Sequence, residues 1–188
     1  MIVGHVGIAF GARALFRDEP LPWLLAATLA PDFLDFAYAA AGVCNVYGVW
    51  SHSLPAVAVT AIVFGALAFA VTRSRATAFL VGVLVLAHLP PDYITGQKML
   101  WPHGPIIGFY LYQRPLWDFA IEAPIVALGW AMLRRDAAAH WWARNVATLA
   151  ALILFQAAMD AAIRPDKSLK PNSCKGVERT ASAVRGLP

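Results

Sequence analysis

One stretch of the sequence constrains the fold more than any other, because residues 54–72 contain no charged side chain. A helix of this length extends for about 30 Å, which is the hydrocarbon thickness of a bilayer. The rest of the chain shares this character, since 60% of the 188 residues are hydrophobic and only 14% are charged. Soluble domains carry about 25% charged residues, so the additional apolar side chains are predicted to face lipid.

Polar, breaker-rich turns divide the remainder of the chain into further apolar segments. These are residues 2–16, 21–42, 76–89, 116–133 and 145–163. We therefore predict an all-α, polytopic membrane helix bundle of about five helices, within a range of four to six, because residues 2–16 are short for a complete span. Residues 1–163 would form this transmembrane domain. Residues 164–188 are polar and basic, which predicts a disordered tail.

The basic residues predict an orientation in the membrane. If each apolar segment spans in turn, seven arginines fall on one side and only Lys98 and Arg114 on the other. The seven are Arg13, Arg17, Arg73, Arg75, Arg134, Arg135 and Arg144. The positive-inside rule places this group in the cytoplasm. The basic tail then falls outside, against the rule, so either it follows the helices or one segment does not span. Because the basic residues are scattered between apolar runs, no nucleic-acid partner is expected.

Histidines and carboxylates collect toward the outer ends of the predicted helices. They are His5, Asp32, Asp35, His52, His88, Asp92, His103, Asp118, Glu122 and Asp160. A charged group at the bilayer centre costs roughly 2.5–3.5 kcal/mol on insertion scales, so such residues usually face a bundle interior. This layer contains almost no lysine or arginine. A divalent metal ion is therefore the predicted counter-charge.

The spacing of these residues supports a metal site in part. Asp32 and Asp35 are three residues apart and share a helix face, and His88 and Asp92 are four apart. Pro90 and Pro91 lie between the latter two, which predicts that the helix ends or kinks there. Taken singly, a Pro–Asp pair is usually a helix break and a histidine at a helix end an interfacial residue. The convergence of several ligand types favours one or two metal ions, with Zn or Mn expected.

The ordered motifs resemble the bacterial inner-membrane predicted metal-dependent hydrolases over about residues 1–135. The motifs are His5, Pro31–Asp32–x–x–Asp35, Ser51–His52–Ser53–Leu54, His88–x–x–x–Asp92, and a later Trp101–Pro102, Gly104–Pro105, Gly108 and Glu122. The resemblance implies that His5, Asp32, His52, His88 and Asp92 bind metal. This chain departs from the family where Gly48–Val49–Trp50 replaces a His-Arg pair, where Ser51 replaces a threonine, and where Pro90–Pro91 interrupts the last motif.

These features predict a metal-dependent hydrolase in the inner membrane, with its site toward the periplasmic face and a lipid or phosphoester as substrate. A metal-bound water would attack the substrate, with Asp35 or Glu122 as general base. Two alternatives stay open. A transporter with intramembrane carboxylates would need a polar path to the inner face, where the sequence has mainly arginine. A non-catalytic membrane protein would need none of these residues.

Overall fold

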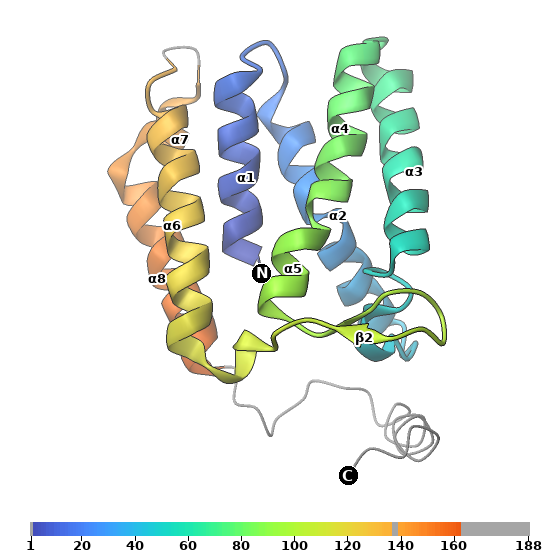
Figure 1. The fold of residues 1–188 in the computed structure, drawn as a ribbon. Coiled ribbons are helices and arrows are strands. Elements are labelled where there is room, and N and C mark those ends of the chain that lie inside the picture. The colour runs from blue at the N-terminus through green and yellow to red at the C-terminus, as the bar shows by residue number, and fades with distance from the viewer. Residues whose placement is uncertain (1, 137–138, 163–188) are drawn as a thin grey trace.

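The computed structural model describes residues 2–136 and 139–162, and these fold into a helical bundle (Figure 1). The helices are α1 (Ile2–Leu15), α2 (Leu21–Ala40), α3 (Leu54–Thr72), α4 (Arg75–Ala87), α5 (Leu89–Thr95), α6 (Pro115–Leu133), α7 (Trp141–Arg144) and α8 (Val146–Ala162). Short 3-10 turns, η1 (Val46–Gly48) and η2 (Leu111–Gln113), and the paired strands β1 (Lys98–Met99) and β2 (Ile106–Ile107) complete the fold. The predicted all-α bundle is confirmed. The tail predicted at 164–188 lies outside the described residues.

Three helical segments are long and apolar enough to cross a membrane. They are Leu54–Thr72, Pro115–Leu133 and the continuous stretch Arg75–Thr95, which comprises α4 and α5. The helices α1 and α8 are also apolar but shorter. On α3, Val59 and Ile62 expose 60% and 71% of their surface. A face of this kind is unfavourable in water and suited to contact with lipid.

Local sequence signals explain where the α3–α4 hairpin begins and turns. The Ser53 hydroxyl accepts a hydrogen bond from the Ala56 amide at the start of α3, and the Ser74 hydroxyl accepts one from the Thr77 amide at the start of α4. These side chains satisfy amides that have no partner within the helix. Between them, Arg73 adopts the left-handed conformation (φ 57°) that ends α3. The result is a tight turn between two antiparallel helices.

The helix α1 packs closely against α6 because small residues face each other where the two helices cross. A Cβ atom added at Gly129 would lie 2.0 Å from the Gly7 carbonyl oxygen, and one added at Gly7 would lie 2.5 Å from Cα of Val126. Small residues allow such backbone approach in membrane bundles, where van der Waals contact drives association. This contact fixes the position of α1, which carries His5.

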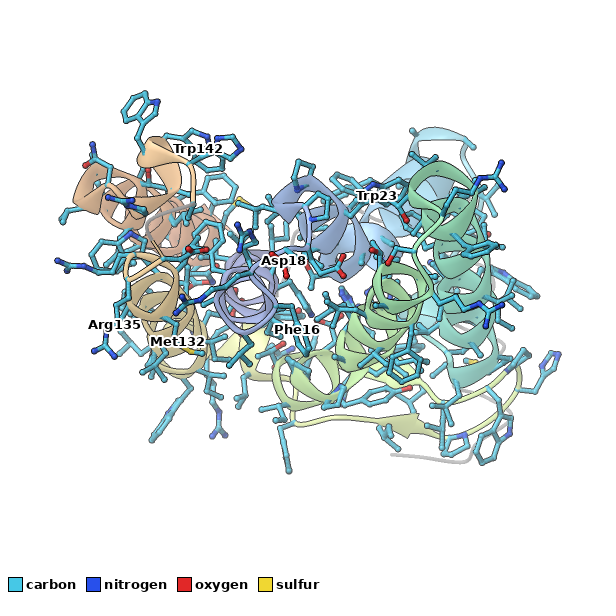
Figure 2. The ribbon with its side chains drawn as sticks, turned by 90° about the horizontal axis from the view of Figure 1, so that it is seen from above. Phe16, Asp18, Trp23, Met132, Arg135 and Trp142 are labelled. Atoms are coloured by element: carbon cyan, nitrogen blue, oxygen red, sulfur yellow. The ribbon has the colours of Figure 1, made fainter. Side chains whose placement is uncertain are left out.

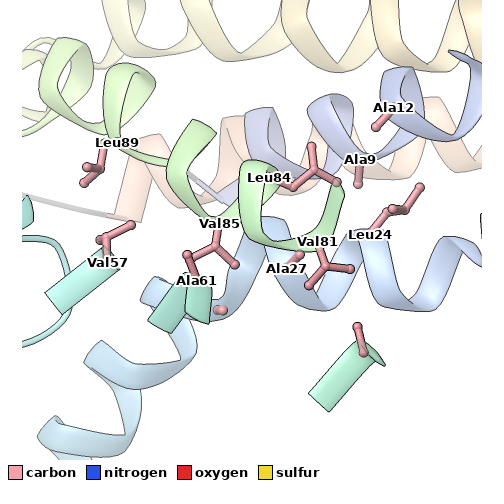
Figure 3. Close-up of a cluster of buried hydrophobic side chains, with 12 residues drawn as sticks. Ala9, Ala12, Leu24, Ala27, Val57, Ala61, Val81, Leu84, Val85 and Leu89 are labelled. Atoms are coloured by element: carbon pink, nitrogen blue, oxygen red, sulfur yellow. The ribbon is translucent and has the colours of Figure 1, made fainter. Parts of the chain in front are cut away.

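The buried apolar side chains form two clusters, and α1 contributes to both. One cluster joins α1, α2, α3 and α4 through residues such as Ala9, Leu24 and Val81 (Figure 3). The other joins α1 to α6 and the α7 region through Phe10 and Leu133. Seen from above, α1 lies between the group α6–α8 and the group α2–α4 (Figure 2). The bundle is therefore organised around α1.

The two ends of the bundle differ in charge. The turns that follow α1, α3 and α6 lie at the upper end in Figure 1, and these turns and the adjoining helix ends carry the seven arginines singled out from the sequence. At this end, Arg13 donates a hydrogen bond to Asp136 at 2.8 Å, which ties α1 to the segment after α6. The long connections 41–53 and 96–114 lie at the opposite end. The seven arginines are thus separated along the bundle from His52, His88 and His103, whereas His140, which precedes α7, lies at the arginine end.

Candidate metal centre

Four side chains from distant parts of the sequence meet at the end of the bundle opposite the arginines. They are Asp32 in α2, His52 in the turn before α3, His88 at the α4–α5 junction and Asp92 in α5. One potential ligand atom from each lies within 4.8 Å of the others, and no second such group of three or more residues occurs within 2–136 and 139–162. His52, His88 and Asp92 are fully buried, whereas 14% of the Asp32 side chain is exposed.

The break between α4 and α5 gives this group its shape. The sequence predicted a break at Pro90–Pro91, and α4 ends at Ala87 while α5 begins at Leu89. Proline removes a backbone donor and cannot continue the hydrogen-bond ladder of a regular helix. His88 lies at the junction itself. Its imidazole is thereby directed to the same point as the Asp92 carboxylate, with 3.4 Å between His88 Nε2 and Asp92 Oδ2.

The distances between the four groups fit donors that share one central ion. His52 Nε2 lies 3.0 Å from Asp92 Oδ2 and 3.4 Å from Asp32 Oδ1, and His88 Nε2 lies 3.8 Å from Asp32 Oδ1. Donors held about 2.1 Å from an ion are about 3.4 Å apart in a tetrahedron and about 3.0 Å apart as octahedral neighbours. Neither imidazole Nε2 makes a hydrogen bond with the described residues despite this proximity. The four groups thus converge closely, and neither Nε2 is occupied by a hydrogen bond within the described residues.

The protonation of His88 follows from its partner on the other side of the ring. His88 Nδ1 lies 2.7 Å from the Thr28 carbonyl oxygen, which can only accept, so Nδ1 carries the proton. In the neutral ring, Nε2 then presents a lone pair toward the carboxylates of Asp32 and Asp92. Lone pairs and negative charges facing one point repel each other unless a cation lies between them. Orientation by a backbone carbonyl is also typical of metal-binding histidines.

His52 is oriented by a chain of polar side chains that ends at Asp35. Its Nδ1 lies 2.6 Å from the Ser51 hydroxyl oxygen, which accepts a hydrogen bond of 2.7 Å from the Asn45 amide. The same amide donates to Asp35 Oδ1 at 2.6 Å. Asp35, predicted as a general base, is therefore outside the group of four and is connected to it through two side chains, those of Asn45 and Ser51. Asn45 was not singled out from the sequence.

His5, the fifth predicted ligand, lies directly against the group of four. Its ring stacks on that of His88, with 3.7 Å between ring centroids and 6° between ring planes. Its two nitrogens lie 3.8 Å from Asp32 Oδ2 and from Asp92 Oδ1, and Nε2 lies 3.2 Å from the His88 carbonyl oxygen. His5 therefore borders both carboxylates without joining the closest set. It could bind a second ion or complete the coordination of the first.

The remaining acidic candidates occupy another part of the bundle. Glu122, the second predicted general base, accepts a hydrogen bond of 3.1 Å from the Gly4 amide in the first turn of α1. A carboxylate is favourable there because the first amides of a helix lack partners. Asp118 and Asp160 are also buried, and Gln156 donates to Asp160 at 2.8 Å. None of these carboxylates belongs to the group of four.

Two residues at the site come from the 96–114 connection and were not predicted from the sequence. Lys98 Nζ lies 3.4 Å from Asp92 Oδ2, so a basic side chain does accompany these carboxylates. Tyr112 accepts a hydrogen bond of 3.3 Å from the Thr95 hydroxyl. Burial, and secondly the Asp92 carboxylate, raise the pKa of Tyr112 well above its usual value. The phenol is therefore protonated at neutral pH.

Comparisons with protein-family models, with curated proteins and with solved structures found no match for this chain. The resemblance to inner-membrane hydrolases therefore stays a prediction.

Proposed function

We propose that this protein is a metal-dependent hydrolase embedded in the bacterial inner membrane, acting on an ester or phosphoester bond of a lipid or other phosphoester. The observation that carries the proposal is the orientation of His88, whose Nε2 faces two carboxylates at a buried point. Two imidazoles and two carboxylates form a donor set suited to Zn or Mn. One or two ions bound there would polarise the substrate oxygen and lower the pKa of a bound water.

The residues of the chain would divide the remaining tasks between them. His52, His88 and Asp92 are buried and oriented, which suits rigid ligands, whereas Asp32 is the one member with an exposed fraction. Substrate would therefore approach from the Asp32 side. Lys98, beside Asp92, lies close enough to the four side chains to bind an anionic substrate oxygen. Asp35 would hold His52 in place through Asn45 and Ser51.

The rest of the bundle argues against transport as an alternative. On the arginine side of the site, the interior contains the apolar cluster of Ala9, Leu24, Ala27, Val81 and Leu84 (Figure 3). Each of these positions lies one to three helical turns from a site residue of the same helix. A transport path would need polar groups or water at this depth. The positive-inside rule places the arginine end in the cytoplasm and the metal centre toward the periplasm.

Metal content tests the proposal directly. Detergent-purified protein should contain about one or two equivalents of Zn or Mn by elemental mass spectrometry. The substitutions His52→Ala and His88→Ala should each remove most of it. His103→Ala is the matched control, because His103 is exposed in the outer connection and should leave the content unchanged. Wild-type protein that takes up neither Zn nor Mn when they are added would overturn the proposal. A loaded wild type would then be assayed against lipid and soluble phosphoesters.

A further inference from the structure

An apolar groove runs between α2 and α3 on the outer surface of the bundle. Its volume is about 450 Å³, and its walls include Leu34 and Tyr38 from α2 and Val59, Val63 and Phe64 from α3. Trp50 and Pro102, from the two long connections, line it as well. We call this feature the α2–α3 groove. It lies on helices with exposed apolar faces, so lipid rather than water would meet it.

Three hydroxyl groups line the groove, those of Tyr38, Ser53 and Thr60, and the last two are already bonded to the protein backbone. The Ser53 hydroxyl donates to the Val49 carbonyl at 2.6 Å, and the Thr60 hydroxyl donates to the Ala56 carbonyl at 2.9 Å. Both residues line the groove. A polar occupant would lose its hydration and gain few partners in exchange, which is unfavourable. The surface chemistry therefore selects a hydrocarbon occupant.

The length of the groove matches one leaflet of a bilayer. Its lining residues on α3 run from Pro55 to Phe64. Nine intervals at a rise of 1.5 Å give about 14 Å along the helix axis. Half of a 30 Å hydrocarbon core is about 15 Å. A single acyl chain extending from the membrane surface to the midplane would therefore follow the groove over its whole length.

One end of the groove adjoins the candidate metal centre. Ser53 lines the groove and directly follows His52, and the Tyr93 hydroxyl donates to the His52 carbonyl at 3.3 Å. Pro102 belongs to the connection that carries Lys98, and this connection is fixed to the start of α3 by a hydrogen bond from the Leu54 amide to the Leu100 carbonyl (2.9 Å). The groove thus runs from the metal-centre end of the bundle toward its apolar middle. This polarity matches a lipid with its headgroup at the metal centre.

We propose that the α2–α3 groove binds one acyl chain of an outer-leaflet membrane lipid, and that this chain positions the lipid headgroup linkage at the metal centre. The placement of the headgroup linkage at the metal centre rests on the proposed hydrolase function, whereas the binding of the acyl chain does not. It narrows the substrate class from lipids or phosphoesters in general to acyl-chain lipids that reach the site laterally from the bilayer.

Photolabelling of the full chain tests the groove. The protein would be reconstituted in phosphatidylethanolamine–phosphatidylglycerol vesicles containing a phosphatidylglycerol with a diazirine in its acyl chain, and adducts would be mapped by mass spectrometry. We expect labelling at Leu34 and Tyr38 that saturates with probe fraction. Val59→Trp would fill the groove and reduce this labelling at least fivefold. Ile62→Trp is the matched control, because Ile62 is exposed on the same helix outside the groove.

Two results would overturn the inference. One is labelling that rises linearly with probe fraction at all exposed positions, as expected for ordinary lipid contact. The other is equal labelling in the Val59→Trp and Ile62→Trp variants. The labelling does not require metal, so a further His52→Ala variant should still be labelled at the groove. Saturable labelling in a wild-type protein that binds no metal would support the groove as a lipid site and refute the hydrolase. Metal binding without saturable labelling would refute only the lipid site in the groove.

Discussion

At the scale of single residues, the orientation of His52 depends on one hydroxyl group. Ser51 is fully buried and contacts both His52 Nδ1 and the Asn45 amide. Groups that orient a metal-binding histidine typically contribute 10–100-fold to metal affinity. Ser51→Ala removes the hydroxyl at little steric cost, so we expect it to weaken Zn binding by roughly that factor in calorimetric titration of the metal-depleted protein.

Two comparison variants make the Ser51 result specific. Ser51→Thr keeps the hydroxyl and should retain wild-type affinity within about threefold. Ser53→Ala removes a neighbouring buried hydroxyl that caps α3 and contacts the Val49 carbonyl instead of His52, so it should change thermal stability and not Zn affinity. Equal affinities in Ser51→Ala and wild type would show that the hydroxyl does not orient the imidazole.

At the scale of helices, the contact between α1 and α6 holds His5 against the site. Gly129→Ala would place a methyl group 2.0 Å from the Gly7 carbonyl oxygen, so the helices would have to separate. Overpacking of this kind usually costs about 1–3 kcal/mol. We expect a lower thermal unfolding midpoint in detergent, measured by circular dichroism, and a reduced metal content.

Gly11 provides the matched control for the Gly129 substitution. Gly11 lies one turn after Gly7 in α1. A Cβ atom added there would lie 3.9 Å from its nearest neighbours, which is an ordinary contact distance. Alanine is also the better helix former by about 1 kcal/mol. Gly11→Ala should therefore match or exceed the wild-type midpoint. A similar loss in both alanine variants would mean that the close approach of α1 and α6 does not limit stability.

Hydropathy and breakers located the helices more reliably than the loops. The charge-free run 54–72 became α3 with the same bounds, and the helix is interrupted at His88, directly before the α5 turn that contains Pro90 and Pro91. Long apolar runs specify helices in lipid because their backbone must satisfy its own hydrogen bonds. The short helix α7 and the β1–β2 hairpin lie in connections that contain no long apolar run. Their structure depends on contacts made only after the helices assemble.

The predicted site residues lie in or next to apolar helices, whereas the residues that were missed lie in the connections between helices. His52, His88, Asp32 and Asp92 were singled out because charge in an apolar layer requires compensation, and the structure brings them together. Asp35 was grouped with Asp32 by its helical spacing, yet its partner is Asn45, across a loop. The position of Lys98 beside Asp92 likewise depends on how the 96–114 connection folds back over the site. Spacing along the sequence contains no information on such contacts.

At the scale of the whole molecule, the difference in charge between the two ends of the bundle predicts one orientation in a membrane. The arginine end has the turn around Asp18, which is exposed, and the metal-centre end has the exposed loop around His103. Basic residues near helix ends are retained in the cytoplasm during insertion. The loop at His103 should therefore face the periplasm and the turn at Asp18 the cytoplasm.

A protease site inserted after Asp18 or after His103 measures this orientation, since exposed loops tolerate such insertions. In spheroplasts of a bacterial host, added protease should cut only the His103 variant, whereas in inverted inner-membrane vesicles it should cut only the Asp18 variant. Metal content of both uncut variants provides the control that the bundle still forms. The reverse pattern would place the metal centre at the cytoplasmic face, and an outer-leaflet lipid could then not reach it. The orientation measurement thus decides which leaflet supplies the substrate.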